Sequence, residues 1–188
     1  MLPLPGSDQS SLLGAALFYA CGMRWPVVPL AHPAHPGEAV QAGPSKDAAT
    51  LSTWWARIPY NVGLPAGCAF DVLDVPVGIG AAALSVLRAT GDLTGPVLNV
   101  GDRYQFLVRT GASIEVFGTL DDAGVSPSEL KLRYRGRGDV LVAPPSTLPH
   151  TTAHWVIEPD LARPQLPDAL AVLPELVRAG LHTVRVNS

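Results

Sequence analysis

The spacing of hydrophobic residues changes along the chain, and this change predicts which elements form. In the first half, apolar residues recur at the three- and four-residue intervals of amphipathic helices, whereas short β-branched and aromatic runs dominate after residue 95. We expect helices over residues 8–21, 47–57, 81–89 and 166–179. We expect strands over residues 25–30, 61–64, 69–76, 96–100, 104–109, 114–117, 130–134, 140–143 and 155–157. Because helices lead and a strand-rich half follows, the pattern predicts an α+β fold.

The strand predicted at residues 69–76 places a carboxylate among apolar side chains. Side chains alternate along a strand, so Asp74 shares one face with Val72, while Asp71 lies on the opposite face. A buried carboxylate is costly unless it is paired, hydrogen-bonded or bound to a metal ion. Asp74 is therefore either a metal ligand or a structural acid, which pairs with an Arg or caps the helix that begins near Gly78.

The composition indicates a globular domain with no general attraction to nucleic acid. The 188 residues are 47% hydrophobic and carry a net charge of −3, so any binding of nucleic acid must come from a local patch. Positive charge gathers at Lys131, Arg133, Arg135 and Arg137, which would point the same way in a strand. This stripe is either a phosphate contact or the solvated face of a half-exposed strand.

The sequence also predicts the domain organisation and the cellular compartment. We expect a loose segment at residues 1–10, a single domain at 11–180 and a C-terminal tail at 181–188. Cys21 and Cys68 lack CxxC spacing and predict buried thiols in a reducing cytosol. The apolar run at residues 12–23 is too short to cross a membrane and lacks the basic start of a signal peptide. We therefore expect a cytoplasmic protein with no membrane partner.

Several stretches, in their order and spacing, resemble one known family. They are Ala16-Leu17-Phe18-Tyr19-Ala20 with Trp25-Pro26-Val27-Val28-Pro29-Leu30, Lys46-Asp47-Ala48 with Trp54-Trp55-Ala56-Arg57, Asn61-Val62-Gly63-Leu64-Pro65-Ala66-Gly67, Val72-Leu73-Asp74-Val75, and the run from Arg135 to Ser146. Together they resemble the bifunctional DNA primase/polymerase N-terminal domain of the archaeo-eukaryotic primase superfamily, over roughly residues 12–170. The chain is most similar to a short, stand-alone subfamily with degenerate catalytic motifs, which carries the same Leu-Asp-Val-Pro in place of the usual acidic pair.

The resemblance implies both a fold and a chemistry. The fold is an RRM-like antiparallel palm sheet flanked by helices, next to a small α/β portion. In active members an Asp-x-Asp-type pair and a third acid hold two divalent metal ions, and a His on a neighbouring strand contacts the nucleotide phosphates. Oxygen ligands suit Mg²⁺ or Mn²⁺, and two such ions stabilise the attacking and leaving oxygens.

This sequence departs from the family pattern at three of the four positions. Asp74 matches the first acid of the pair, but Pro76 stands at the second position and cannot ligate a metal ion. The His position falls at Tyr104, and the third acid falls at Arg133. One carboxylate with an Arg nearby is a poor divalent-metal site, so Asp74 is interpreted as a remnant of the metal site, with no metal bound.

Three hypotheses about function remain open. The first is a catalytically degenerate domain without a cofactor, which binds DNA, RNA or a nucleotide as an accessory or regulatory module. Its candidate binding residues are Arg103, Tyr104, Lys131, Arg133, Arg135 and Arg137. The second is an active nucleotidyltransferase with Mg²⁺ or Mn²⁺ in a rearranged site of Asp71, Asp74 and Asp139, which requires a bulge or a register shift. The third is a protein-interaction module with no nucleic-acid role.

Overall fold

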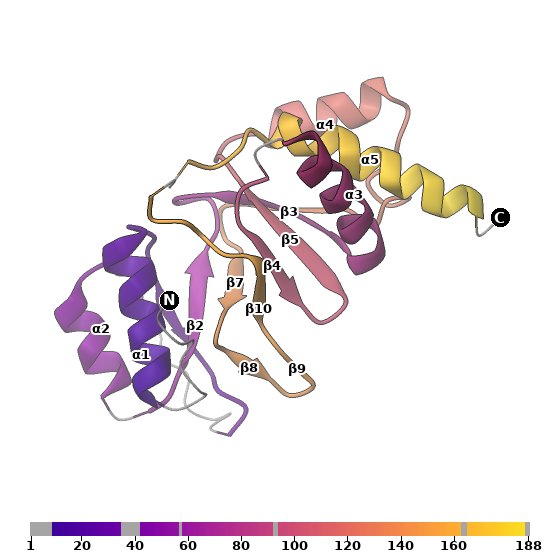
Figure 1. Cartoon of the computed structure of the whole chain (residues 1–188). Coiled ribbons are helices and arrows are strands. Elements are labelled where there is room, and N and C mark those ends of the chain that lie inside the picture. Colours follow the sequence, from indigo (N-terminus) through magenta and orange to yellow (C-terminus); the bar gives the residue numbers. More distant parts are fainter. Residues whose placement is uncertain (1–8, 35–41, 57, 92–93, 163–164, 187–188) are drawn as a thin grey trace.

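The molecule has two adjoining halves, each built around an antiparallel sheet that combines distant parts of the sequence (Figure 1). The computed structural model describes residues 9–34, 42–56, 58–91, 94–162 and 165–186. The first half comprises α1 (Gln9–Leu17), the π-helical turn η1 (Phe18–Gly22), α2 (Ala48–Trp55) and the three-stranded sheet of β1 (Val28–Leu30), β2 (Asn61–Pro65) and β7 (Val140–Ala143), in that order. A small hairpin of β8 (Thr147–Leu148) and β9 (Thr151–Thr152) follows β7.

The second half is a five-stranded sheet with helices against one face (Figure 1). Its strands, in spatial order, are β10 (His154–Ile157), β4 (Val97–Val100), β5 (Arg103–Val108), β3 (Asp71–Pro76) and β6 (Arg133–Arg135). Its helices are α3 (Val77–Thr90), α4 (Ser113–Asp122) and α5 (Ala169–Val186). All four strand pairings in this sheet are antiparallel. The predicted α+β class is confirmed, as is the antiparallel sheet flanked by helices.

Alternation along the strands gives the protein two hydrophobic cores. Val72 of β3 and Leu107 of β5 belong to the core shared with α1 and α2. Leu73 and Phe106, one residue away on the same strands, belong to the core under α3, α4 and α5. Each central strand therefore supplies both cores, and the face of β3 that carries Val72 and Asp74 looks away from the three helices.

Capping residues in the local sequence determine two of the helix ends. The carboxylate of Asp47 caps α2 by accepting a 2.7 Å hydrogen bond from the backbone N–H of Thr50. Gly91 ends α3 in the left-handed conformation, with φ of 76°, a backbone angle that suits glycine. Helix α3 follows β3 without a loop: Pro76 is the last residue of the strand and also the N-cap of the helix.

The strand predicted at residues 114–117 is wrong, because these residues lie in α4. Over only four residues, the apolar positions fit both the two-residue period of a strand and the 3.6-residue period of a helix. The longer spacing decides the structure, since Val116 and Leu120 are one helical turn apart and both are buried.

The strand predicted at residues 130–134 is only partly correct. Lys131 has a positive φ of 48°, which interrupts an extended chain, and the strand β6 begins at Arg133. At the C-terminus, α5 continues to Val186, into the residues assigned above to a tail. Most of the expected N-terminal loose segment, residues 1–8, lies outside the described residues.

The buried environment predicted for the cysteines is also wrong: Cys21 and Cys68 are free thiols and both are exposed. Each lies close to a glycine, at the end of η1 and in the turn before β3 respectively, where the chain runs at the surface. A small apolar residue type therefore does not by itself decide burial in a turn.

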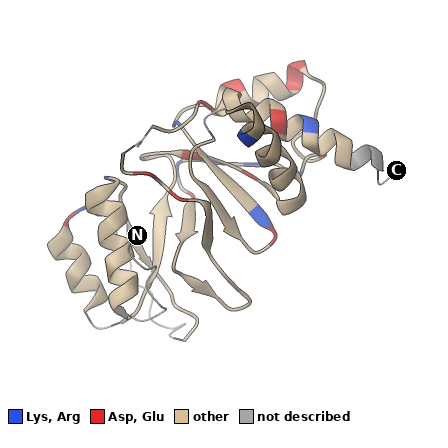
Figure 2. Ribbon diagram, in the orientation of Figure 1, with Lys and Arg blue, Asp and Glu red and all other residues tan. Residues whose placement is uncertain are grey.

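Charged residues are distributed unevenly over the two halves (Figure 2). The helices α1 and α2 contain no Lys, Arg, Asp or Glu, whereas the five-stranded sheet and its helices carry charges of both signs. Within the described residues, no helix is both long enough and apolar enough to span a membrane.

Candidate functional site

The register of the five-stranded sheet decides which side chains surround Asp74. In antiparallel strands, residues directly opposite each other project to the same face. Asp74 of β3 is opposite Gln105 of β5 on one side and Arg133 of β6 on the other. Arg103 and Arg135 occupy the next positions on the same face, opposite Pro76 and Val72. Three arginines and one glutamine thus frame a single carboxylate.

Both carboxylate oxygens of Asp74 are bound by arginine. Oδ1 accepts a 2.5 Å hydrogen bond from Arg103 Nε, and Oδ2 accepts a 2.6 Å hydrogen bond from Arg135 Nε. Gln105 Nε2 adds a 3.1 Å hydrogen bond to Oδ2. The Asp74 side chain is fully buried, while the side chains of Arg103 and Arg135 remain 12% and 26% exposed. Asp74 is therefore the buried centre of an Arg–Asp–Arg cluster whose arginines reach the surface.

Further contacts fix Arg103 in place, whereas the guanidinium of Arg135 is held at Nε alone. Arg103 Nη2 donates to the backbone carbonyls of Asp74 and Lys131, at 2.8 and 2.7 Å. The positive φ of Lys131, which interrupts the predicted strand, occurs at the residue whose carbonyl accepts this bond. Arg135 lies in the short edge strand β6, which among the described strands pairs with β3 alone. Within the described residues, the terminal nitrogens of Arg135 have no hydrogen-bond partner.

The residues around Asp74 do not fit the two divalent metal ions that the resemblance implies. Such ions need several hard oxygen ligands, and a shared pair needs carboxylates that bridge or flank them. Here the only carboxylate on this face of β3 has both oxygens engaged by guanidinium groups, and Pro76 follows two residues later. A cation placed beside Asp74 would lie against Arg103 and Arg135, which repel it.

Asp71 lies on the opposite face of β3 and has different partners. Its Oδ2 accepts hydrogen bonds from the backbone N–H of Gly111, at 2.7 Å, and from the hydroxyl of Tyr134, at 2.5 Å. Burial raises the pKa of Tyr134, and the hydrogen bond to Asp71 and the charge of Asp71 raise it further. Tyr134 is next to Arg135, so Asp71 holds the edge strand from one face while Asp74 holds it from the other.

The remaining sequence-predicted residues do not converge on Asp74. Asp139 accepts a 3.1 Å hydrogen bond from the backbone N–H of Gly136, within the turn that follows β6. Tyr104 projects to the other face of β5, against α3: a Cβ added at Gly80 would lie 2.6 Å from Tyr104 Cβ. The structure therefore brings together neither the three carboxylates of the rearranged site nor Tyr104 and Asp74.

The basic stripe is likewise only partly assembled. Arg133 and Arg135 lie in β6 on the face of Asp74, and Arg133 is exposed. Lys131 precedes the strand and Arg137 follows it, where its backbone packs against Gly67. Both of these side chains are exposed. The cluster on the Asp74 face therefore contains Arg103, Arg133 and Arg135.

Two neighbours of the carboxylates were missed from the sequence. Gln105 contacts Asp74, and Tyr134 contacts Asp71. The alternation of Arg103 and Gln105 was a usable signal, since both must share a face that Tyr104 cannot share. The groups around Asp74 and around Asp71 each contain a buried acceptor without a hydrogen-bond partner in the described residues, namely Gln105 Oε1 and Asp71 Oδ1 respectively.

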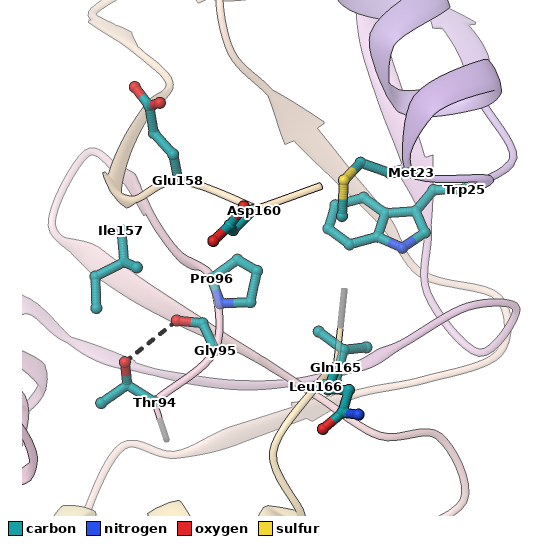
Figure 3. A pocket seen from close by; sticks show the side chains of 10 residues that line it. All are labelled: Met23, Trp25, Thr94, Gly95, Pro96, Ile157, Glu158, Asp160, Gln165 and Leu166. Carbon is teal, nitrogen blue, oxygen red and sulfur yellow. Dashed lines mark hydrogen bonds between the residues drawn. The ribbon is translucent and has the colours of Figure 1, made fainter. Parts of the chain in front are cut away.

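Three cavities of the described structure lie away from the Asp74 face. One of about 130 Å³ lies between the two halves, where Met23 and Trp25 stand across from Ile157 and Thr94 (Figure 3). Another of about 380 Å³ is lined by residues of the loop before α4, and a third of about 290 Å³ lies between α3 and Tyr104. None of the three is lined by Asp74, Arg103, Arg133 or Arg135.

Comparison with known proteins identifies the family. Residues 16–176 match the profile of the bifunctional DNA primase/polymerase N-terminal domain. No curated protein and no solved structure matches the chain. The matched range includes every strand of both sheets, among them β3, β5 and β6. The chain therefore belongs to the family of bifunctional DNA primase/polymerase N-terminal domains.

Proposed function

We propose that this chain is a primase/polymerase-like domain without nucleotidyltransferase activity, which acts as an accessory or regulatory module by binding nucleic acid or nucleotides. The observation that carries the proposal is the state of Asp74, the residue that matches the first catalytic acid. Its two carboxylate oxygens accept hydrogen bonds from Arg103 and Arg135. A carboxylate held in this way is part of a salt-bridge cluster, and both of its oxygens are already engaged by guanidinium groups.

The chemistry of nucleotide transfer supports this proposal. Two-metal catalysis stabilises charge on both the attacking and the leaving oxygen, and this requires several acidic ligands at one point. At the other expected ligand positions the chain has Pro76 and Arg133. The rearranged alternative needs Asp71 and Asp139 beside Asp74, but Asp71 is bonded to Gly111 and Tyr134 on the opposite face of β3. Asp139 is bonded within its own turn.

The binding half of the proposal rests on the family and on the local charge. Family membership implies binding of nucleic acid or nucleotide. Arg103, Arg133 and Arg135 share one face with a single acid, which leaves an excess of positive charge there although the whole chain carries a net charge of −3. Arginine is well suited to phosphate because its planar guanidinium donates two parallel hydrogen bonds.

Catalysis is tested by primer extension and by de novo priming on a single-stranded template, with Mg²⁺ and with Mn²⁺. We expect no product from the native chain. Synthesis that disappears in the Asp74→Ala variant would overturn the proposal, because it would make Asp74 a working catalytic residue. Synthesis that persists in Asp74→Ala and stays with the chain through further purification would also overturn the proposal, whereas synthesis that purification removes belongs to a contaminating polymerase.

Binding is tested by fluorescence anisotropy with a labelled single-stranded oligonucleotide over a series of salt concentrations. We expect the logarithm of the association constant to fall linearly with the logarithm of the salt concentration, since counterions are released from the phosphates. The third hypothesis, a protein-interaction module, predicts no binding to the oligonucleotide at any salt concentration.

A further inference from the structure

We infer that the Arg–Asp–Arg cluster and the neighbouring Arg133 form a phosphate-binding site that operates without a divalent metal ion, with the guanidinium groups of Arg103, Arg133 and Arg135 in the place of the metal ions. The inference rests on the proposed function and specifies how the ligand is held. Its ligand chemistry is the phosphoryl oxygens of nucleic acid or of a nucleotide.

The first argument is the charge on this face of the sheet. Arg103 and Arg135 contribute two positive charges around the one negative charge of Asp74, and Arg133, directly opposite Asp74, adds a third. The local excess of two charges has the same sign as a divalent cation. A phosphoryl group that approaches this face meets the neutralising charge that a metal ion supplies elsewhere.

The second argument is the pre-organisation of the guanidinium groups. An exposed Arg loses about 2 kcal/mol of side-chain conformational freedom when a ligand fixes it. Here Asp74 already binds Arg103 and Arg135 through Nε, and the Lys131 carbonyl binds Arg103 through Nη2. A ligand would therefore meet donors that are already oriented, which favours binding.

The third argument is the set of donors left free. Asp74 uses only Nε of Arg135, so both terminal nitrogens of this guanidinium remain without a partner in the described residues. Arg133 makes no hydrogen bond or ion pair with any described residue and is exposed. The two side chains are two residues apart on one strand, about 7 Å, and both can donate to a phosphate chain.

The edge strand β6, which presents these donors, is also held in position from the face of the sheet opposite to Asp74. Tyr134 lies between Arg133 and Arg135 but faces the other way, and its hydroxyl donates to the buried Asp71. Without this bond, the three-residue edge strand would depend on its pairing with β3 and on the Arg135–Asp74 contact. Because β6 is held in this way, Arg133 and Arg135 keep a fixed position relative to Asp74, which a binding site for an extended anion requires.

The test measures the dissociation constants of the full chain for a labelled single-stranded oligonucleotide and for inorganic triphosphate, with EDTA and with added Mg²⁺. We expect both ligands to bind in EDTA, and Mg²⁺ to weaken binding because it neutralises the phosphates. Oligonucleotide binding alone assigns the site to a nucleic-acid backbone, and tighter triphosphate binding assigns it to a nucleotide. Binding that requires Mg²⁺ or Mn²⁺ overturns the inference while leaving the proposed function intact. The absence of binding in every condition overturns both.

Variants locate the site. Arg133→Gln leaves all the Asp74 contacts in place, and we expect it to weaken binding in EDTA about tenfold and to reduce the salt slope by about one. Arg135→Gln should weaken binding at least as much, and Arg135→Lys should not restore it, since an ammonium lacks the planar fork. Arg178→Gln is the matched control, because Arg178 is an exposed Arg on α5 paired with Glu175. Unchanged affinity in Arg133→Gln and in folded Arg135→Gln, verified by circular dichroism, overturns the inference.

Discussion

The substitution Asp74→Asn separates a structural acid from a catalytic one by its effect on stability. The change keeps the size of the side chain but removes the charge that balances Arg103 and Arg135. Removing one partner of a buried ion pair costs about 3–5 kcal/mol, because the other charge is left uncompensated. The two arginines keep 12% and 26% of their side-chain exposure, so water solvates part of the released charge. We therefore expect the lower end of that range, a loss of about 3 kcal/mol.

Urea denaturation in the presence of EDTA, followed by circular dichroism, measures this loss directly. In a thermal denaturation experiment on a chain of this length, the same loss of about 3 kcal/mol corresponds to a fall in Tm of about 6–12 °C. A carboxylate kept only for metal binding is not needed for folding, so its replacement in the absence of a metal ion leaves the free energy of unfolding unchanged or raises it. Unchanged or increased stability in Asp74→Asn would therefore refute the structural role assigned to Asp74.

Two further variants control this measurement. Asp168→Asn removes an acid whose partner, Arg109, is 65% exposed, so we expect a loss of only about 0–1 kcal/mol. The double variant Asp74→Asn with Arg135→Gln removes one of the uncompensated charges together with the acid. It should therefore be more stable than the sum of the two single effects predicts.

The remaining predictions concern the elements that hold the site. Tyr134→Phe removes the hydrogen bond to buried Asp71 and should lower the free energy of unfolding by about 1–2 kcal/mol, measured by urea denaturation; an unchanged midpoint would contradict the pinning of β6. Because the pKa of Tyr134 is raised in the folded protein, its stabilising contribution is complete below the ordinary tyrosine pKa of about 10 and is lost as the pH rises above it. Alkaline unfolding should accordingly be less steep with pH in Tyr134→Phe than in the native chain. Gly80→Ala places a Cβ 2.6 Å from Tyr104 Cβ and should cost about 1–3 kcal/mol, whereas Gly78→Ala, in the same helix with open space around it, should be neutral or stabilising by up to about 1 kcal/mol. Equal thermal stability of these two variants would contradict the packing of Tyr104 on α3.

The sequence by itself determined the features that depend on neighbouring residues. The caps at Asp47 and Gly91 are local, and so is the alternation that puts Asp74 and Asp71 on opposite faces of β3. The pairing of Asp74 with an Arg was one of the two structural alternatives that the sequence offered, and the structure contains it. The other alternative, capping of α3 by Asp74, is wrong, because that helix has no side-chain cap.

Only the tertiary structure decided which side chains meet across the sheet. Tyr104 matches the His position of the family pattern, yet it lies on the face of β5 opposite to Asp74, and a shift of one residue moves a side chain to the other face of a strand. The register that prevents this shift comes from backbone pairing between segments about thirty and sixty residues apart, and from buried groups such as Gln105 and Tyr134. Periodicity within one segment specifies a face, but contact across strands depends on how distant segments align. For this reason the sequence predicted a buried acid near arginine, while the structure was needed to identify Arg103 and Arg135 as its partners.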